Sequence, residues 1–160
     1  MANTKNRVLV GVANIEIKYP TGGAYVDAGY TEDGVILEVG TDTADIEVEE
    51  ETVPIERVIT KETVAVILNM AESSLFNIDK AIPGATLVTA TISIGDGTIK
   101  EMSIKMTGTT PTGGTRTIEI PLATAVGTVA QSYTKDAKTV VPVRFEALKG
   151  AGAAVTIIDT

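Results

Sequence analysis

The fold is decided by Val64-Ala-Val-Ile-Leu-Asn-Met-Ala-Glu-Ser-Ser-Leu-Phe-Asn-Ile-Asp-Lys-Ala-Ile-Pro-Gly84, a strand followed by a short helix. In the first seven residues Val64, Val66, Leu68 and Met70 alternate with Ala65, Ile67 and Asn69. Side chains two apart on a strand point to the same face, so this alternation predicts a strand with one strongly apolar face.

The second half of the stretch predicts a helix over about residues 73–82. Ser73 or Ser74 can cap it, because a serine hydroxyl accepts a hydrogen bond from an unpaired N–H of the first turn. Apolar residues then recur at helical spacing, at Leu75, Ile78, Ala81 and Ile82. Pro83-Gly84 ends the helix. Two to three turns are marginal alone, so we expect the helix to pack on the flank of a sheet.

Outward from this stretch the chain is rich in β-branched residues and turn signals. We expect turns at Tyr30–Gly34, Thr60–Glu62, Gly95–Gly97 and Gly108–Gly114. The predicted strands are Val8–Tyr19, Val35–Val39, Ile55–Ile59, Thr63–Met70, Thr86–Ile94, Thr98–Met106, Arg116–Leu122, Val126–Tyr133, Val140–Leu148 and Val155–Ile158. Frequent strands with little helix predict a mainly β fold, a sandwich or barrel-like domain with one flanking helix.

The length of 160 residues fits a single domain, 1–160. We expect three appendages on it: a flexible N-terminal arm (1–7), an acidic loop (40–54) and a C-terminal arm (150–160) that begins in a small-residue joint. The polar N-terminus lacks the features of a signal peptide, and no apolar run reaches the length of a membrane span. We therefore expect the protein to stay where it is made, without a membrane partner.

The composition excludes several kinds of chemistry. The chain has no His, Cys or Trp and carries a formal net charge of −8. A Ser-His-Asp or Cys-His triad, a thiolate metal site and a disulfide are therefore impossible. The negative charge and scarce aromatic residues also argue against a nucleic-acid-binding surface. Ser132-Tyr-Thr-Lys135 matches the S-x-x-K pattern of serine acyl-enzymes, but the companion motifs are missing. We predict no catalytic residue and no cofactor.

The negative charge is concentrated in one segment. Residues 19–56 contain 11 of the 21 acids and no Lys or Arg, whereas the other residues have 10 acids and 13 bases, a net of +3. Apolar residues interleave these acids, which predicts a strand with a charged face, and Glu47, Glu49 and Glu51 alternate as a row on it. The acids lack the spacing of a calcium-binding loop, so no metal site is predicted.

Four segments resemble the major tail tube proteins of long-tailed, siphovirus-like bacteriophages. These are the strand VLVGVANIEIKY from Val8, the turn and strand Asp27-Ala-Gly-Tyr-Thr-Glu-Asp-Gly-Val-Ile-Leu-Glu-Val39, the strand and helix unit Val64–Ala81, and Val141-Pro-Val-Arg-Phe-Glu-Ala147. Together they are spread over most of the length of the chain, and their order and spacing match the family.

The resemblance implies a structural protein of the virion tail. Such proteins form a β-sandwich with one flanking helix and assemble, in the host cytoplasm, into hexameric rings whose sheets join around a channel. Rings stack into a tube through a long loop and terminal arms. The implied partners are other copies of the chain, a tape measure protein, and tail terminator and baseplate proteins, while DNA passes through the tube without specific binding.

For the acidic segment the physics leaves two interpretations open. Carboxylates on a channel wall or at a ring junction would repel DNA phosphates, and six-fold symmetry would multiply that effect. Alternatively, the acids only solubilise the outer surface. The candidate lumen or ring-stacking residues are Glu38, Asp42, Asp45, Glu47, Glu49, Glu50 and Glu51.

Two other structural functions remain open at the level of sequence. One is the inner tube of a contractile injection or secretion device, and the other is a β-sandwich decoration or adhesion domain. Rings or tubes are expected for either tube protein, whereas a decoration domain predicts a monomer or trimer with an exposed binding face. An enzyme is disfavoured because no acid–base constellation is present.

Overall fold

The computed structural model describes residues 14–95 and 97–160. Within these ranges the chain is mainly β, with one short helix. The elements are β1 (Asn14–Lys18), β2 (Tyr25–Asp27), β3 (Thr31–Ile46), β4 (Glu56–Met70), α1 (Leu75–Ala81), β5 (Ala85–Val88), β6 (Thr91–Ile94), β7 (Met102–Thr109), β8 (Thr115–Val126), β9 (Val141–Ala147) and β10 (Thr156–Asp159).

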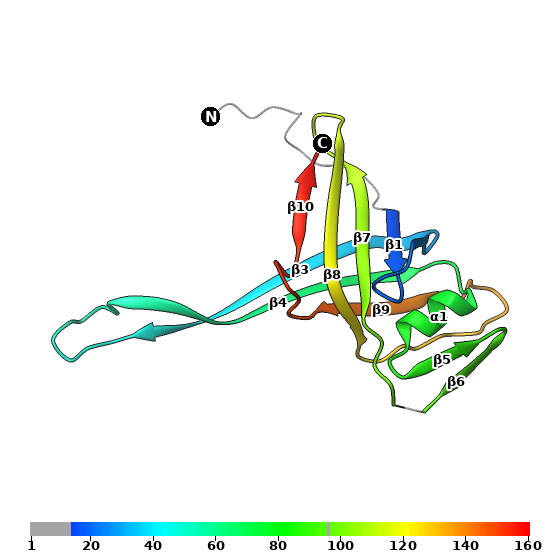
Figure 1. Cartoon of the computed structure of the whole chain (residues 1–160), viewed down its shortest axis with the longest axis horizontal. Helices are drawn as coiled ribbons and strands as arrows, with labels where there is room; N and C mark the ends of the chain where they lie inside the picture. Colours follow the sequence, from blue (N-terminus) through cyan, green and yellow to red (C-terminus); the bar gives the residue numbers. More distant parts are fainter. Residues whose placement is uncertain (1–13, 96) are drawn as a thin grey trace.

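Eight strands form one antiparallel sheet that bends over itself. Its order is β2-β1-β7-β8-β9-β4-β3, with β10 paired to β8 beside this path. In Figure 1, β1, β7, β8 and β10 run across the direction of β3, β4 and β9, so the sheet makes two crossed layers. Among the described strands, the order ends at β2 and β3 and does not close into a barrel. The predicted mainly β class with one flanking helix is confirmed.

The core lies between the two layers and receives the inward faces of both. The expected face of β4 is buried, as are Ile15 and Ile17 of β1, Ile104 of β7 and Phe145 of β9. On the opposite face of β4, Ala65 is also buried. It pairs with Glu38 on one side and Glu146 on the other, and the Arg144 guanidinium bonds both of these carboxylates. This group of charged side chains covers Ala65.

The helix α1 begins and ends close to the predicted boundaries. Ser74 is the N-cap, and its hydroxyl accepts a hydrogen bond from the N–H of Asn77 at 3.2 Å. The expected apolar stripe is only partly correct, since Leu75 is exposed. The side chains that α1 buries are Asn77, Asp79, Lys80 and Ala81. Part of the buried face of α1 is therefore polar, and these side chains are paired with other polar groups of the protein.

The largest correction concerns β3 and β4. Tyr30–Gly34 is not a turn between elements, because Asp33 and Gly34 form an irregularity with positive φ inside the continuous strand β3. Thr60–Glu62 is not a turn either, since β4 continues through it. Residues 40–46 of the predicted acidic loop belong to β3, which leaves only residues 47–55 as the connection. Pairing to β4 extends the strand through an acidic sequence whose composition alone indicates a loop.

Two more predicted strands are wrong. Thr86–Ile94 is a two-stranded hairpin, β5 and β6, whose turn is at Thr89-Ala90, with Thr89 at φ 55°. The expected hairpin at Gly95–Gly97 includes Asp96, outside the described residues, and β6 does not pair with β7 among the strands described. Val126–Tyr133 is irregular after Val126, where Gly127 takes a φ of 86° that ends the strand.

The predictions for the two chain ends fall only partly on described residues. The predicted last strand is present as β10, which pairs with residues 116–119 of β8. The predicted N-terminal arm (1–7) and the first part of the strand predicted from Val8 lie outside the described residues.

Candidate assembly surface

A long hairpin arm projects from the body of the protein. We define the arm as residues 41–62, the parts of β3 and β4 that extend beyond the body together with their connection (Figure 1). All of these residues are exposed except Pro54, which is half-buried. Strands advance about 3.3 Å per residue, so the arm reaches roughly 20 Å or more from the body.

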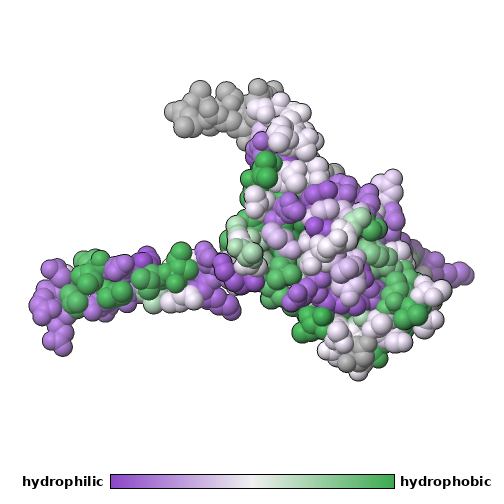
Figure 2. Space-filling view, in the orientation of Figure 1, coloured by the Kyte–Doolittle hydropathy of each residue, from purple (hydrophilic) through white to green (hydrophobic). Residues whose placement is uncertain are grey.

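The arm exposes apolar side chains along its length, which Figure 2 shows as patches between hydrophilic residues. Val53 keeps 69% of its surface exposed. The other exposed large apolar residues of the arm are Ile46, Val48, Ile55, Val58 and Ile59. Scattered single apolar residues are normal on a surface, but a continuous projecting element of this kind is typical of an interaction surface.

One ion pair braces the arm across its strands. The Arg57 Nε donates to the Asp45 carboxylate at 2.5 Å, and its Nη2 donates to the second oxygen at 3.0 Å. This hydrogen bond lowers the pKa of the Asp45 carboxyl below its usual range. A bidentate contact fixes geometry, although an exposed pair adds little stability.

The predicted acidic site residues fall into two separate groups. Asp42, Asp45, Glu47, Glu49, Glu50 and Glu51 lie on the arm, whereas Glu38 lies on the sheet of the body, where the Arg144 Nη2 donates to its carboxylate at 3.0 Å. Glu47, Glu49 and Glu51 do not form the expected alternating row on a strand, because residues 47–55 make the turn. Glu49, Glu50 and Glu51 have no cation within ion-pair distance among the described residues.

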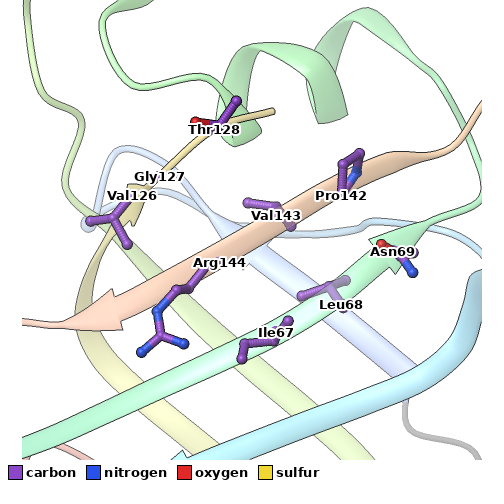
Figure 3. Close-up of a pocket in the computed structure, with 9 residues that line it drawn as sticks. All are labelled: Ile67, Leu68, Asn69, Val126, Gly127, Thr128, Pro142, Val143 and Arg144. Atoms are coloured by element: carbon purple, nitrogen blue, oxygen red, sulfur yellow. The ribbon is translucent and has the colours of Figure 1, made fainter. Parts of the chain in front are cut away.

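A groove lies at the base of the arm. It has a volume of about 500 Å³ and is lined by Val39, Glu62 and Val64 of the hairpin, and by residues 147–149 and 152–155. A smaller open groove of about 280 Å³ runs beside β9 (Figure 3). Arg144 lines this second groove, and its guanidinium already hydrogen-bonds Glu38 and Glu146. The other residues that line the groove are mostly apolar. Neither groove brings together groups that could carry out acid–base chemistry.

The opposite end of the molecule holds a buried charged cluster. Two ammonium groups share one carboxylate there: Lys80 contacts the Asp79 carboxylate at 2.5 Å, and Lys100 contacts its second oxygen. Lys100 also donates to the Asp79 carbonyl at 3.1 Å. The Lys80 Nζ lies 3.9 Å from the ring centre of Tyr19, a cation–π contact.

This cluster lines a pocket of about 340 Å³ together with Tyr19, Thr86, Leu87 and Thr98. The sequence patterns described above do not predict this cluster. The available signal was the triplet Ile78-Asp79-Lys80, which interrupts the apolar spacing of the helix with two adjacent charges.

A second tyrosine, Tyr25, links strand β2 to strand β8. The Tyr25 hydroxyl donates to the Glu119 carboxylate at 2.7 Å. Burial and this hydrogen bond raise the pKa of Tyr25. The Nζ atoms of Lys18 and Lys105 lie 4.7 and 4.3 Å from its ring centre.

Metal sites, membrane spans and the S-x-x-K pattern can each be checked in the part of the chain that the structure describes. Residues 14–95 and 97–160 contain no group of three or more potential metal ligands. Across the same ranges, no helix combines the length and apolar character that a membrane span requires. Ser132 and Lys135 are both exposed, in the irregular segment between β8 and β9.

The matches to known proteins come from solved structures. No protein-family profile matches the chain, and no curated protein matches it. Among solved structures, a chain described as the tail of an empty GTA particle with C6 symmetry is 10% identical and aligns with a TM-score of 0.48. The alignment covers 100% of this chain and 99% of that chain.

Proposed function

We propose that the protein is a structural subunit that self-assembles into stacked hexameric rings and so forms the tail tube of a siphovirus-like phage particle. DNA passes through the channel of this tube without specific binding. The subunits assemble in the host cytoplasm and remain in the tail of the virion. The tape measure, tail terminator and baseplate proteins are the further partners, by resemblance of the sequence to major tail tube proteins.

The arm is the observation that carries this proposal. Full burial of a Val or Ile side chain contributes about 1.5–3 kcal/mol, and the arm's six large apolar residues are on average about half exposed. Docking therefore adds roughly 1 kcal/mol for each, or roughly 6 kcal/mol for the arm. Association costs at least about 4 kcal/mol. One arm contact is thus weak, and a closed ring of many contacts is needed for a stable assembly.

The open ends of the sheet support the same proposal. Among the described strands, β2 and β3 end the strand order, and β10 pairs on one side only, with β8. Unpaired sheet edges pair readily with another chain, and identical subunits in a ring can satisfy them by symmetry. A subunit with such edges and a projecting arm suits repeated self-association better than it suits a soluble monomer.

We assign the acidic candidates by their position. Glu47, Glu49, Glu50 and Glu51 at the tip of the arm, with Asp42 and Asp45 along it, belong to the junction between rings. Glu38 lies on the outer face of the body's sheet, where a ring could turn it toward the lumen. Any of these carboxylates that faces the channel would repel the phosphates of passing DNA.

Electron microscopy of the purified full chain tests the proposal. We expect rings or tubes with a central hole and six-fold symmetry above a threshold concentration, with a matching rise in mass by light scattering. Monomers or trimers that persist at high protein concentration would contradict the proposal and favour a decoration or adhesion domain.

A further inference from the structure

The two ends of the molecule's longest axis differ in shape and charge. The arm forms one end, and α1 with the β5–β6 hairpin forms the other (Figure 1). We call the latter the helix end and define it as α1, β5, β6 and residues 97–100. Val88, Ile94 and Ile99 of the helix end remain 66–67% exposed. Each end of one molecule therefore presents unburied apolar side chains.

The tip of the arm is acidic, whereas the pocket of the helix end places two ammonium groups against one described carboxylate. The tip of the arm has Glu49, Glu50 and Glu51 in sequence, without a cation within ion-pair distance among the described residues. The pocket of the helix end has the ammonium groups of Lys80 and Lys100 around the carboxylate of Asp79. Both lysine side chains are at most 9% exposed. Attraction to a carboxylate entering this partly desolvated pocket is stronger than between groups in bulk water.

We propose that the arm of one copy docks on the helix end of a second copy. A carboxylate of the tip then lies at the Lys80–Lys100 pocket, and Val48, Val53 and Ile55 pack on the exposed apolar residues of β5, β6 and residue 99. The two surfaces differ, so the contact is heterologous and can repeat without limit along one direction. This inference rests on the proposed tube function and names the surface that receives the arm.

Cross-linking between two single-cysteine variants tests the contact, because the natural chain contains no cysteine. Val53→Cys and Val88→Cys are made separately, mixed under assembly conditions and treated with a short thiol-reactive cross-linker. Ile157→Cys replaces Val88→Cys in the matched control, since Ile157 is similarly exposed on β10, away from the helix end. We expect a strong cross-linked dimer band with Val88→Cys and at most one-tenth of that yield with Ile157→Cys.

The outcomes separate this inference from the function on which it rests. Tubes that form while Val53→Cys links to Ile157→Cys as well as to Val88→Cys, or better, would overturn the docking site and leave the tube function standing. Failure of the unmodified chain to form any rings or tubes would overturn both.

A charge variant tests the role of the lysine pocket. Glu49→Gln with Glu50→Gln removes two charges from the tip, and Asp42→Asn with Glu62→Gln removes two from the shaft of the same arm. We expect the tip variant to raise the concentration needed for assembly about tenfold and to weaken its dependence on salt, and the shaft variant to change it less than threefold. Equal effects of the two variants, or assembly of the tip variant at lower concentration than the natural chain, would exclude docking of the acidic tip at the pocket.

Discussion

Removal of the arm should abolish assembly and leave the fold intact. Gly40 and Thr63 are directly paired across β3 and β4, so a two-residue Asn-Gly turn can join them in place of residues 41–62. The arm contributes no residue to the buried core. Its 22 residues hold eight acids and two bases, so the deletion changes the net charge from −8 to −2.

The expected effect on stability is small because the arm contributes no side chain to the core. Each of its exposed cross-strand side-chain pairs contributes only about 0.2–1 kcal/mol, and the conformational entropy lost by ordering the arm opposes that contribution. We therefore expect the free energy of unfolding to change by no more than about 1 kcal/mol. For a domain of this size that corresponds to a shift in Tm of about 4 °C or less.

Thermal unfolding followed by circular dichroism measures the first expectation, and electron microscopy with sedimentation measures the second. A second variant, Val53→Ser with Ile55→Ser, keeps the arm's length and charge and removes only apolar surface. It should raise the concentration needed for assembly without changing Tm. The reasoning would be refuted if the shortened chain lost its cooperative unfolding transition, or if it formed tubes at the same concentration as the natural chain.

Three further changes probe the body and the C-terminal strand. Phe145→Ala should lower the free energy of unfolding by about 3–5 kcal/mol in chemical denaturation, because the fully buried ring would leave a cavity at the centre of β9; a loss under 1 kcal/mol would mean that the core is misplaced. Ser74→Ala removes the cap of α1 and should cost about 1 kcal/mol by the same measurement, with exposed Ser132→Ala as the neutral control. The Arg116 guanidinium hydrogen-bonds Asp159 and lowers the pKa of that carboxyl below its usual 3.8. A lowered pKa means that this pair's contribution is fully present above that usual value and is lost as the pH falls through the lowered value. The hydrogen-exchange protection of β10, measured relative to the intrinsic exchange rate at each pH, should therefore fall in acid, and Asp159→Asn should remove that response.

The parts of the fold that the sequence predicts are those with strict periodicity or clear stop signals. The buried face of β4, the helix capped by Ser74 and strands β9 and β10 follow directly from alternation, capping and turn residues. The long hairpin could not be predicted in the same way. Its strands continue through Asp42, Lys61 and Glu62, where neither face is buried and no alternation is required. Pairing between β3 and β4 stabilises these residues as strand. The pattern within either segment alone does not show that pairing.

The candidate site shows the same limit more sharply. The run of acids in residues 40–51 is visible in the sequence, and most of it lies on the arm. The Lys80–Asp79–Lys100 cluster is hidden, since Lys100 is brought to the helix from 20 residues away by the β5–β6 hairpin. A local pattern can indicate that Asp79 interrupts an apolar stripe, but the partner that stabilises a buried carboxylate is set by the tertiary fold.

The arm combines exposed apolar residues, which promote association, with carboxylates at its tip, which oppose association between two tips. In the free subunit an apolar hairpin is an aggregation hazard, because its edges and side chains can pair with any similar strand. Two acidic tips that meet repel each other, so tip-to-tip association of free subunits is disfavoured. A surface that combines cations with apolar residues, such as the helix end, can pair with the carboxylates of the tip and bury the apolar side chains of the arm at the same time. The concentration of charge at the tip can therefore select the correct partner surface, at little cost to solubility, while the apolar residues supply most of the binding free energy.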